Sequence, residues 1–278
     1  MLCIVYVITI GSCLFAIGLL AERALPATAA RRWIWMAVIA LSIAIPPMYR
    51  FWHRATVHSA SLVHASSHDD LLGTLLLFSM RLTAALAVAQ ALRVSYLIRR
   101  ERRGPAVVDG VPSVITDSIG PATVGVLRPR VVIPRWVLAL PPVQRRYVLR
   151  HEEEHRNSRD TLLLFVASIA AVFMPWNPAI WWQLKRLRLA VEMDCDNRVV
   201  AALGDARAYG QLLVRVAEAA SRGPRLQPAL LGMGMLERRI AELVAPSTRT
   251  LGVRVLASAA AVALLYVVLV LPHPFAGH

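Results

Sequence analysis

The chain has 278 residues, of which 57% are hydrophobic and 17% charged, and its mean hydropathy is +0.54. These values exclude a wholly soluble protein and predict an integral membrane protein with one soluble or half-immersed domain. The net charge is +14, from 31 basic and 17 acidic residues. Because the basic residues are scattered beside apolar segments, we expect them to contact anionic lipid headgroups and we expect no direct nucleic-acid partner.

Four apolar stretches are long enough to cross a bilayer, which takes about 20 residues. They are Leu2–Ala21, Trp33–Tyr49, a part of Leu71–Ile98, and Val253–Leu271. The first could instead be a signal peptide with a cleavage site near residues 27–30. No basic residue precedes it and it is long for a signal, so we interpret it as a retained helix.

The basic residues predict the topology of these spans. Residues 22–32 and 99–252 carry most of them, which puts both segments in the cytoplasm and the N-terminus, the loop 50–70 and the C-terminal tail outside. We therefore expect three transmembrane helices at 1–98, a cytoplasmic domain at 99–252, and a last transmembrane helix with a short tail at 253–278. The loop contains four histidines, which could sense a metal or pH or could simply be solvated: His53, His58, His64 and His68.

The pattern changes between Gly104 and Pro134, where Pro, Gly and Val dominate. Short β-type runs separated by turn dipeptides predict a small antiparallel sheet or hairpin, with an open edge. The runs are Ala106–Val108, Ser113–Thr116, Thr123–Leu127 and Val131–Ile133.

The sequence His-Glu-Glu-Glu-His at 151–155 follows the sheet region. Pro141-Pro142 opens a helix that we expect to run through about Asp160, since proline is tolerated in the first turn. On this helix His151 and His155 lie one turn apart and can bind one zinc ion, and Glu152 can accept a proton from the attacking water. A chance pair of surface histidines is the alternative.

A catalytic zinc needs a third protein ligand. Glu192 is the best candidate, and Asp196 follows it on the same helical face, where it can hold a zinc-binding imidazole through the other ring nitrogen. Asp194 should point to solvent. An ordinary charged helix face would give the same pattern. The cysteines, Cys195 among them, do not suggest a disulfide framework.

In combination these motifs resemble those of the BlaR/MecR-type membrane metallopeptidases, the proteolytic part of the β-lactam-sensing antirepressors. The resemblance rests on the following segments: His151–Asp160, Asn177-Pro178 with the following tryptophans, Glu192 with Cys195-Asp196, the Thr-Val-Gly-Val-Leu-Arg-Pro-Arg-Val-Val-Ile-Pro run at 123–134, and Leu236–Ile240.

The resemblance implies a gluzincin-like zinc protease domain in a mostly α-helical membrane protein. It implies that His151, His155 and Glu192 bind Zn²⁺ and that Glu152 is the general base. The family's sensors carry a large extracellular penicillin-binding domain after the last span. This chain stops at His278, so we do not expect direct β-lactam sensing.

The resemblance also bears on a fifth apolar stretch, Thr161–Trp182, which is interrupted at 174–178. If Glu192 reaches the same zinc as His155, both must lie on one side of the membrane. A single crossing by residues 161–182 would separate them, so we expect a re-entrant helical hairpin that turns at Pro175–Pro178.

We therefore predict a plasma-membrane zinc endopeptidase that cuts a cytoplasmic protein, such as a winged-helix transcriptional repressor. The substrate could add as an extended strand near Thr123–Leu127, and a homodimer stays open as an assembly. One alternative is a housekeeping or prenyl-protein-type membrane metalloprotease, and another is a non-catalytic signalling scaffold. The sequence leaves the activating signal open.

Overall fold

The computed structural model describes residues 2–25, 31–56, 67–221, 234–244 and 250–270. They belong to two compact units, which we describe separately.

The first unit comprises Met1–Ala87, Ala167–Leu187 and Thr248–His278, and the second comprises Val88–Val166 and Arg188–Ser247. The expected division at residues 98 and 252 separates membrane from cytoplasmic segments, and it stays a prediction.

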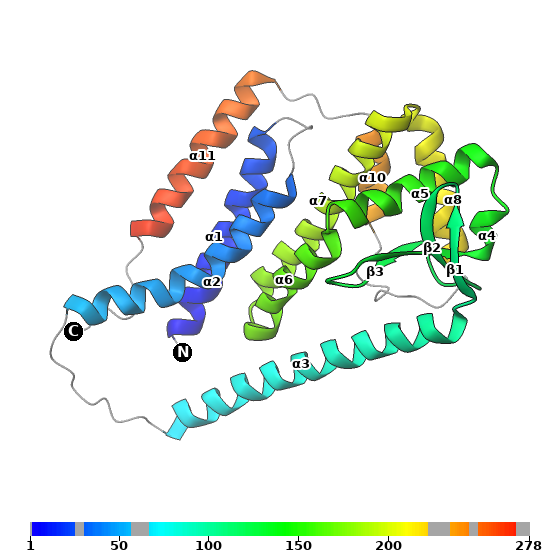
Figure 1. Cartoon of the computed structure of the whole chain (residues 1–278). Coiled ribbons are helices and arrows are strands. Elements are labelled where there is room, and N and C mark those ends of the chain that lie inside the picture. Colours follow the sequence, from blue (N-terminus) through cyan, green and yellow to red (C-terminus); the bar gives the residue numbers. More distant parts are fainter. Residues whose placement is uncertain (1, 26–30, 57–66, 222–233, 245–249, 271–278) are drawn as a thin grey trace. The chain divides into compact units, whose positions relative to one another are not determined.

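The first unit is a group of apolar helices around α1 (Leu2–Ala24). This helix packs against α2 (Arg31–Thr56) and α11 (Leu251–Val270), as Figure 1 shows. Glycine permits close approach, since a Cβ atom at Gly18 would lie 2.9 Å from the ring of Trp35.

Buried polar side chains connect the start of α7 (Pro178–Leu203) to α1 and α2 in this unit. The amide nitrogen of Gln183, which is fully buried, donates to the carbonyl of Gly11 and to Ser42 Oγ, both at 2.9 Å. Glu22 accepts hydrogen bonds from Trp35 Nε1 at 2.7 Å and from Arg186 at 2.8 Å. These contacts fix the first turns of the helix that later supplies Glu192.

Three helices among the described residues are long and apolar enough to cross a membrane: Ile4–Ala24, Leu71–Glu101 and Leu251–Val270. They coincide with the first, third and fourth predicted spans. The second predicted span, Trp33–Tyr49, lies on α2, whose side chains from residue 48 onward fall outside the described residues, and its role as a span stays a prediction. The same holds for the side chains of the four histidines of the 50–70 loop.

The fifth apolar stretch forms two helices with a turn between them, as predicted. α6 (Asp160–Phe173) has 14 residues and is therefore about 21 Å long, less than the roughly 30 Å of hydrocarbon in a bilayer. Asn177 Oδ1 accepts a hydrogen bond from the backbone N–H of Ala179 at 3.0 Å and so caps α7. Insertion of this hairpin into a bilayer stays a prediction.

The second unit contains a four-stranded sheet. Its strands are β1 (Gly104–Val108), β2 (Val111–Thr116), β3 (Ala122–Val124) and β4 (Arg130–Pro134), and their order is β1-β2-β4-β3.

The expected antiparallel hairpins are present, since β1 pairs with β2 and β3 with β4 in antiparallel fashion, but the sheet as a whole is mixed, so a wholly antiparallel sheet was wrong. In the hairpin of β3 and β4, the strand β4 also pairs with β2, and this pairing is parallel. Ile115 of β2 lies opposite Ile133 of β4. The third strand also ends at Val124 rather than Leu127, because Gly125 takes up φ +109° and starts the turn. β3 is an edge strand, as predicted.

The sheet is followed by the short α4 (Arg135–Leu138) and by α5 (Pro142–Asn157), which packs against β3 and β4. α5 ends three residues before the predicted Asp160. The chain turns at Arg159, which has φ +52°, and α6 then begins at Asp160. α8 (Ala206–Ser221) and α10 (Met235–Val244) complete the unit.

One apolar core joins the sheet to α5, α7 and α8. It includes Val131 and Ile133 of β4, Tyr147 of α5, Val199 of α7 and Tyr209 of α8, each at most 5% exposed. Burial of such side chains stabilises the fold by about 1.5–3 kcal/mol each. This core holds the polar face of α5 against α7.

Candidate metal and catalytic site

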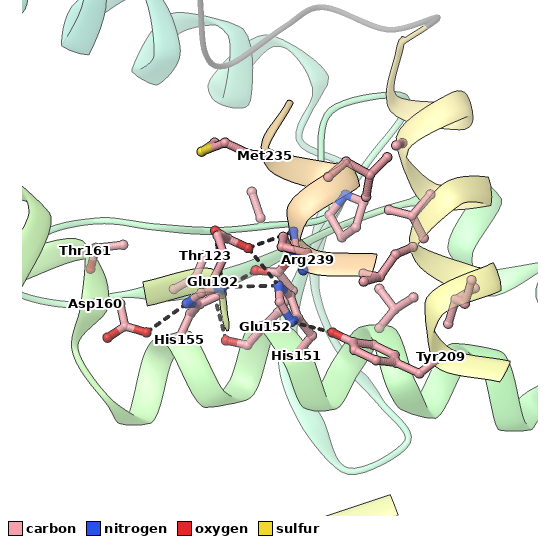
Figure 2. Close-up of a pocket in the computed structure, with 18 of the residues that line it drawn as sticks. Thr123, His151, Glu152, His155, Asp160, Thr161, Glu192, Tyr209, Met235 and Arg239 are labelled. Atoms are coloured by element: carbon pink, nitrogen blue, oxygen red, sulfur yellow. Dashed lines mark hydrogen bonds and ion pairs between the residues drawn. The ribbon is translucent and has the colours of Figure 1, made fainter. Parts of the chain in front are cut away.

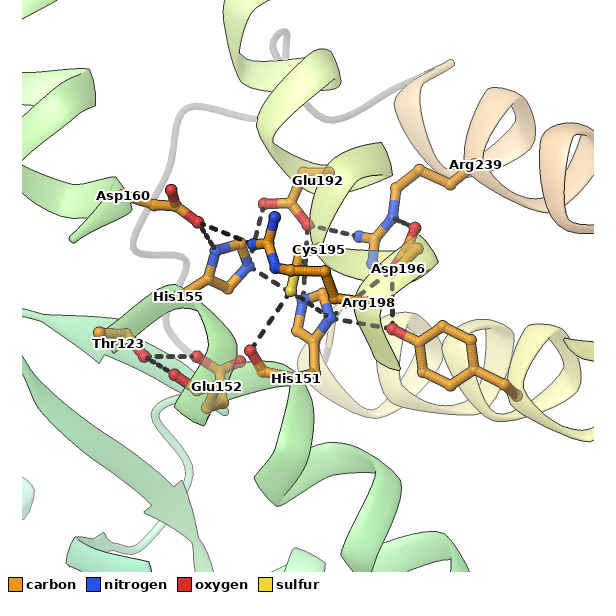
Figure 3. Close-up of polar contacts among 11 residues, drawn as sticks. Thr123, His151, Glu152, His155, Asp160, Glu192, Cys195, Asp196, Arg198 and Arg239 are labelled. Carbon is orange, nitrogen blue, oxygen red and sulfur yellow. Dashed lines mark hydrogen bonds and ion pairs between the residues drawn. The ribbon is translucent and has the colours of Figure 1, made fainter. Parts of the chain in front are cut away.

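The two histidines of α5 face each other as the helical spacing predicts. His151 Nε2 and His155 Nε2 lie 3.1 Å apart, and the rings are nearly perpendicular, at 88° (Figure 3). Both side chains are largely buried. Two imidazole nitrogens that converge in a buried place are suited to hold one cation.

Glu192 of α7 comes to the same place. Its carboxylate oxygens lie 3.6 Å from His151 Nε2 and 3.7 Å from His155 Nε2. Donor atoms bound at about 2.0–2.2 Å to one tetrahedral zinc are roughly 3.3–3.6 Å apart. The structure brings the three predicted ligands together at donor separations of 3.1–3.7 Å, close to this range, and their role as zinc ligands stays a prediction.

Cys195 lies one turn after Glu192 and is fully buried. Together with His151 and His155 it forms a group whose potential ligand atoms all lie within 4.8 Å of one another. Its sulfur lies 3.3 Å from His151 Nδ1, on the side of the ring opposite Nε2. The Nε2 atoms thus converge with Glu192, while the sulfur faces the back of one imidazole. No role for Cys195 at the site was predicted from the sequence.

Each imidazole has a different partner on Nδ1. For His155 this partner is Asp160, whose carboxylate oxygen lies 2.8 Å away and whose side chain is 2% exposed. The turn at Arg159 directs the first residue of α6 back to α5. From the sequence, Asp160 was expected only as the end of a helix, because the turn that brings it back to α5 has no clear sequence signal.

Asp196 lies near the other imidazole, where the sequence predicts a positioning carboxylate. The direct distance from its Oδ1 to His151 Nδ1 is 3.6 Å. The hydroxyl of Tyr209 bridges the two, at 2.9 Å from the nitrogen and 2.7 Å from Asp196 Oδ1. Asp194 is buried, so the expectation that it points to solvent was wrong.

Arg239 of α10 connects the acidic residues. Its guanidinium donates to both carboxylate oxygens of Asp196 at 2.8 Å, and its Nη1 lies 2.9 Å from Glu192 Oε2. The planar fork of arginine matches a carboxylate in this two-bond geometry. In the sequence, Arg239 stood out only as part of the Leu236–Ile240 segment.

Glu152 lines the same cavity as the histidines, with its carboxylate turned toward Thr123 of the sheet, and it is 6% exposed. The Thr123 hydroxyl lies 2.7 Å from its backbone carbonyl oxygen and 3.0 Å from its carboxylate Oε2. Since β3 carries Thr123, the edge strand is in direct contact with the predicted base.

Opposite charges outweigh burial throughout the cluster. Burial alone would raise the pKa of Glu192, but the charges of Arg239 and His155 hold it far below its usual range. Burial would lower the pKa of His151, yet Cys195 and Glu192 raise it to about 10. The pKa of His155 is raised and that of Cys195 is lowered for the same reason. A metal ion must therefore displace protons from the imidazoles.

These groups line one side of a cavity of about 530 Å³ (Figure 2). The other side is apolar and comes mainly from α8 and α10, through Leu212, Leu213, Val216, Met235 and Leu236. The cavity therefore combines a polar wall that can do chemistry with an apolar wall that can hold an aliphatic or aromatic side chain.

Comparisons with known proteins agree with this arrangement. The model of the BlaR1 peptidase M56 family matches residues 71–243, a range that includes every site residue described above. The regulatory protein BlaR1 of Bacillus licheniformis is 26% identical over 97 residues, which is 34% of this chain and 16% of that protein. The chain therefore matches only a small part of that relative's length.

Proposed function

Because this chain belongs to the BlaR1 peptidase M56 family of membrane metallopeptidases, we propose that it is a zinc endopeptidase that cleaves a protein in the cytoplasm. The observation that carries this proposal is the convergence of His151 Nε2, His155 Nε2 and Glu192 on one buried place beside Glu152.

The donor set supports zinc as the metal. Two neutral imidazoles and one carboxylate are a ligand set of catalytic zinc sites, which leave a fourth position for water or substrate. When bound, zinc makes a water molecule more acidic and polarises the scissile carbonyl. Asp160 accepts the hydrogen of His155 Nδ1, so Nε2 is the nitrogen that would bind the metal after losing its proton.

Glu152 is the residue that moves protons in this proposal. Its carboxylate takes a proton from the attacking water and delivers it to the leaving amine nitrogen. Thr123 holds Glu152 from the side of the sheet and restricts its rotamers. The base is thus positioned before the substrate arrives, which avoids reorganisation during the reaction.

The cavity supports a polypeptide substrate. An extended segment can add beside the edge strand β3 with main-chain hydrogen bonds, while one apolar side chain enters the pocket wall formed by Leu212, Leu213 and Val216. The regulatory role in the name of the Bacillus relative supports a substrate in a signalling pathway, such as a transcriptional repressor.

The cytoplasmic placement rests on charge. Residues 99–252 carry most of the basic residues, which favours the cytoplasmic side of a plasma membrane. The short α6 and the turn before Pro178 support a hairpin that enters the membrane without crossing it.

The test compares new protein N-termini in cells that express the wild type with those in cells that express Glu152→Gln. The wild type should generate one or a few cytoplasmic cleavage products that the variant lacks. Glu153→Gln is the matched control, because it makes the same change at the next residue of α5, where Glu153 pairs with Arg156 at 2.8 Å. Equal processing by Glu152→Gln would favour a non-catalytic scaffold and would refute the proposal.

A further inference from the structure

The two imidazoles of the site are held in different ways. Asp160 contacts His155 Nδ1 directly, at 2.8 Å. At His151 the corresponding partner is the hydroxyl of Tyr209, at 2.9 Å, and the carboxylate of Asp196 lies behind it. A neutral hydroxyl thus stands where the other imidazole has a carboxylate.

The position of the single hydroxyl hydrogen follows from its neighbours. Arg239 donates two hydrogen bonds to Asp196, which keeps that side chain an acceptor. Tyr209 must therefore donate its hydrogen to Asp196 Oδ1, at 2.7 Å. Its oxygen is then left to accept a hydrogen bond from His151 Nδ1–H.

Cys195 is the other group near this nitrogen. Its sulfur lies 3.3 Å from His151 Nδ1 and 3.4 Å from the carbonyl oxygen of the same residue. The Tyr209 oxygen is the nearer of the two to Nδ1, at 2.9 Å. A hydrogen bond from Nδ1–H to either group leaves Nε2 for the metal.

We propose that Tyr209 is a positioning residue that keeps the proton of His151 on Nδ1 and so presents Nε2 to the metal. This inference rests on the proposed function, because it assigns a role toward the zinc ligand set. Asp196 and Arg239 act through Tyr209, and in this way α7, α8 and α10 together orient a ligand carried by α5. Loss of such a supporting partner typically weakens metal binding about 10–100-fold.

The surroundings of Tyr209 hold its ring in one place. The side chain is 1% exposed, and the ring stacks on Tyr147 with centroids 5.5 Å apart. Tyr147 donates its own hydroxyl to the carbonyl of Gly204 at 2.9 Å, away from the histidines. Tyr147→Phe is therefore a matched control that removes a tyrosine hydroxyl from the same stack.

The experiment measures zinc affinity of the purified full chain in detergent by competition with a chromogenic chelator. Tyr209→Phe should bind zinc 10–100-fold more weakly than the wild type, whereas Tyr147→Phe should bind it equally. Cobalt(II) in place of zinc reports the ligand geometry, and its visible spectrum should change in Tyr209→Phe only. Equal zinc affinity and an unchanged cobalt spectrum in Tyr209→Phe would overturn the inference.

A second measurement does not depend on how well the variant folds. Nitrogen-15 spectra of histidine-labelled, zinc-loaded wild type should show the proton of His151 on Nδ1, and a proton on Nε2 would overturn the inference. If the wild type binds zinc, Tyr209→Phe binds it more weakly, and the wild type cleaves no protein, only the proposed function is refuted. A wild type that does not bind zinc would refute both.

Discussion

Opposite charges and hydrogen bonds are concentrated in a small buried volume at this site. Glu192 and Asp196 both pair with Arg239, and the histidines lie within 4 Å of Glu192. Leaving a charge in such a place without its partner costs about 3–5 kcal/mol. The network therefore constrains every member to one geometry, which a metal site requires.

This network makes zinc binding depend on pH. The pKa of His151 is raised to about 10, and that of His155 is also raised. Without metal, both rings are therefore imidazolium ions near neutrality, with a proton on each nitrogen. Protons therefore compete with zinc, and the affinity should rise with pH until the pH approaches 10. Imidazoles of ordinary pKa, about 6.5, would give an affinity that levels off above that pH.

Calorimetry in buffers of different ionisation enthalpy measures the protons released. At pH 7.5, zinc binding should displace the additional proton of each imidazolium, so we expect a net release well above one proton and approaching two. Histidines of ordinary pKa would release only about 0.2 in total. A release near that lower value would show that the buried charges do not act on the histidines.

At the scale of single residues, the sequence revealed those whose spacing is local. His151, Glu152 and His155 lie within five positions, and Glu192 lies on a charged helix at a spacing that a third ligand allows. Tyr209 and Arg239 could not be predicted. They come from helices far along the chain, and their contacts depend on packing that no periodicity encodes.

At the scale of elements, we expect the edge strand β3 to connect substrate docking to the proposed base. It leaves one side of the sheet unpaired and carries Thr123, which contacts the base. An edge with free N–H and C=O groups can accept an added strand.

Val124→Pro tests this role, because proline removes an N–H and disfavours regular strand pairing. We expect cleavage to fall at least tenfold while zinc binding stays unchanged. Val107→Pro places the same change on β1, the opposite edge of the sheet, and should have little effect on cleavage. The measurement is the cleavage rate of each variant. Equal rates for Val124→Pro and Val107→Pro would show that β3 does not bind the substrate.

The elements also show where sequence patterns fail. The four strands were recognisable from β-branched residues between turn dipeptides. Their order was not, because β2 pairs with β4, and β3 lies between these two strands in the sequence. The end of α5 was misplaced because nothing in the sequence marks Arg159 as left-handed.

At the scale of the whole molecule, three helices among the described residues could cross a membrane, by length and composition, and the candidate site lies in a unit built from separate segments. His155 and Glu192 lie 3.7 Å apart, so in a membrane protein both would be on the same side of the bilayer. Hydropathy alone would count the stretch 161–182 as another span. The contact between residues on either side of it supports a hairpin.

Alkaline phosphatase fusions test the topology, since this enzyme is active only after export. Fusions after residues 62 and 270 should be active, and a fusion after residue 103 should be inactive, because the basic residues favour the cytoplasm. A matched green fluorescent protein series should give the opposite pattern. An active phosphatase at residue 103 would place the catalytic unit outside and contradict a cytoplasmic substrate.

The most direct measurement determines zinc content and cleavage for purified wild type, Glu152→Gln and Glu192→Gln. We predict one zinc per chain in the wild type and in Glu152→Gln, a large loss of zinc in Glu192→Gln, and cleavage by the wild type alone. Full cleavage by Glu152→Gln, or full zinc content in Glu192→Gln, would contradict the account.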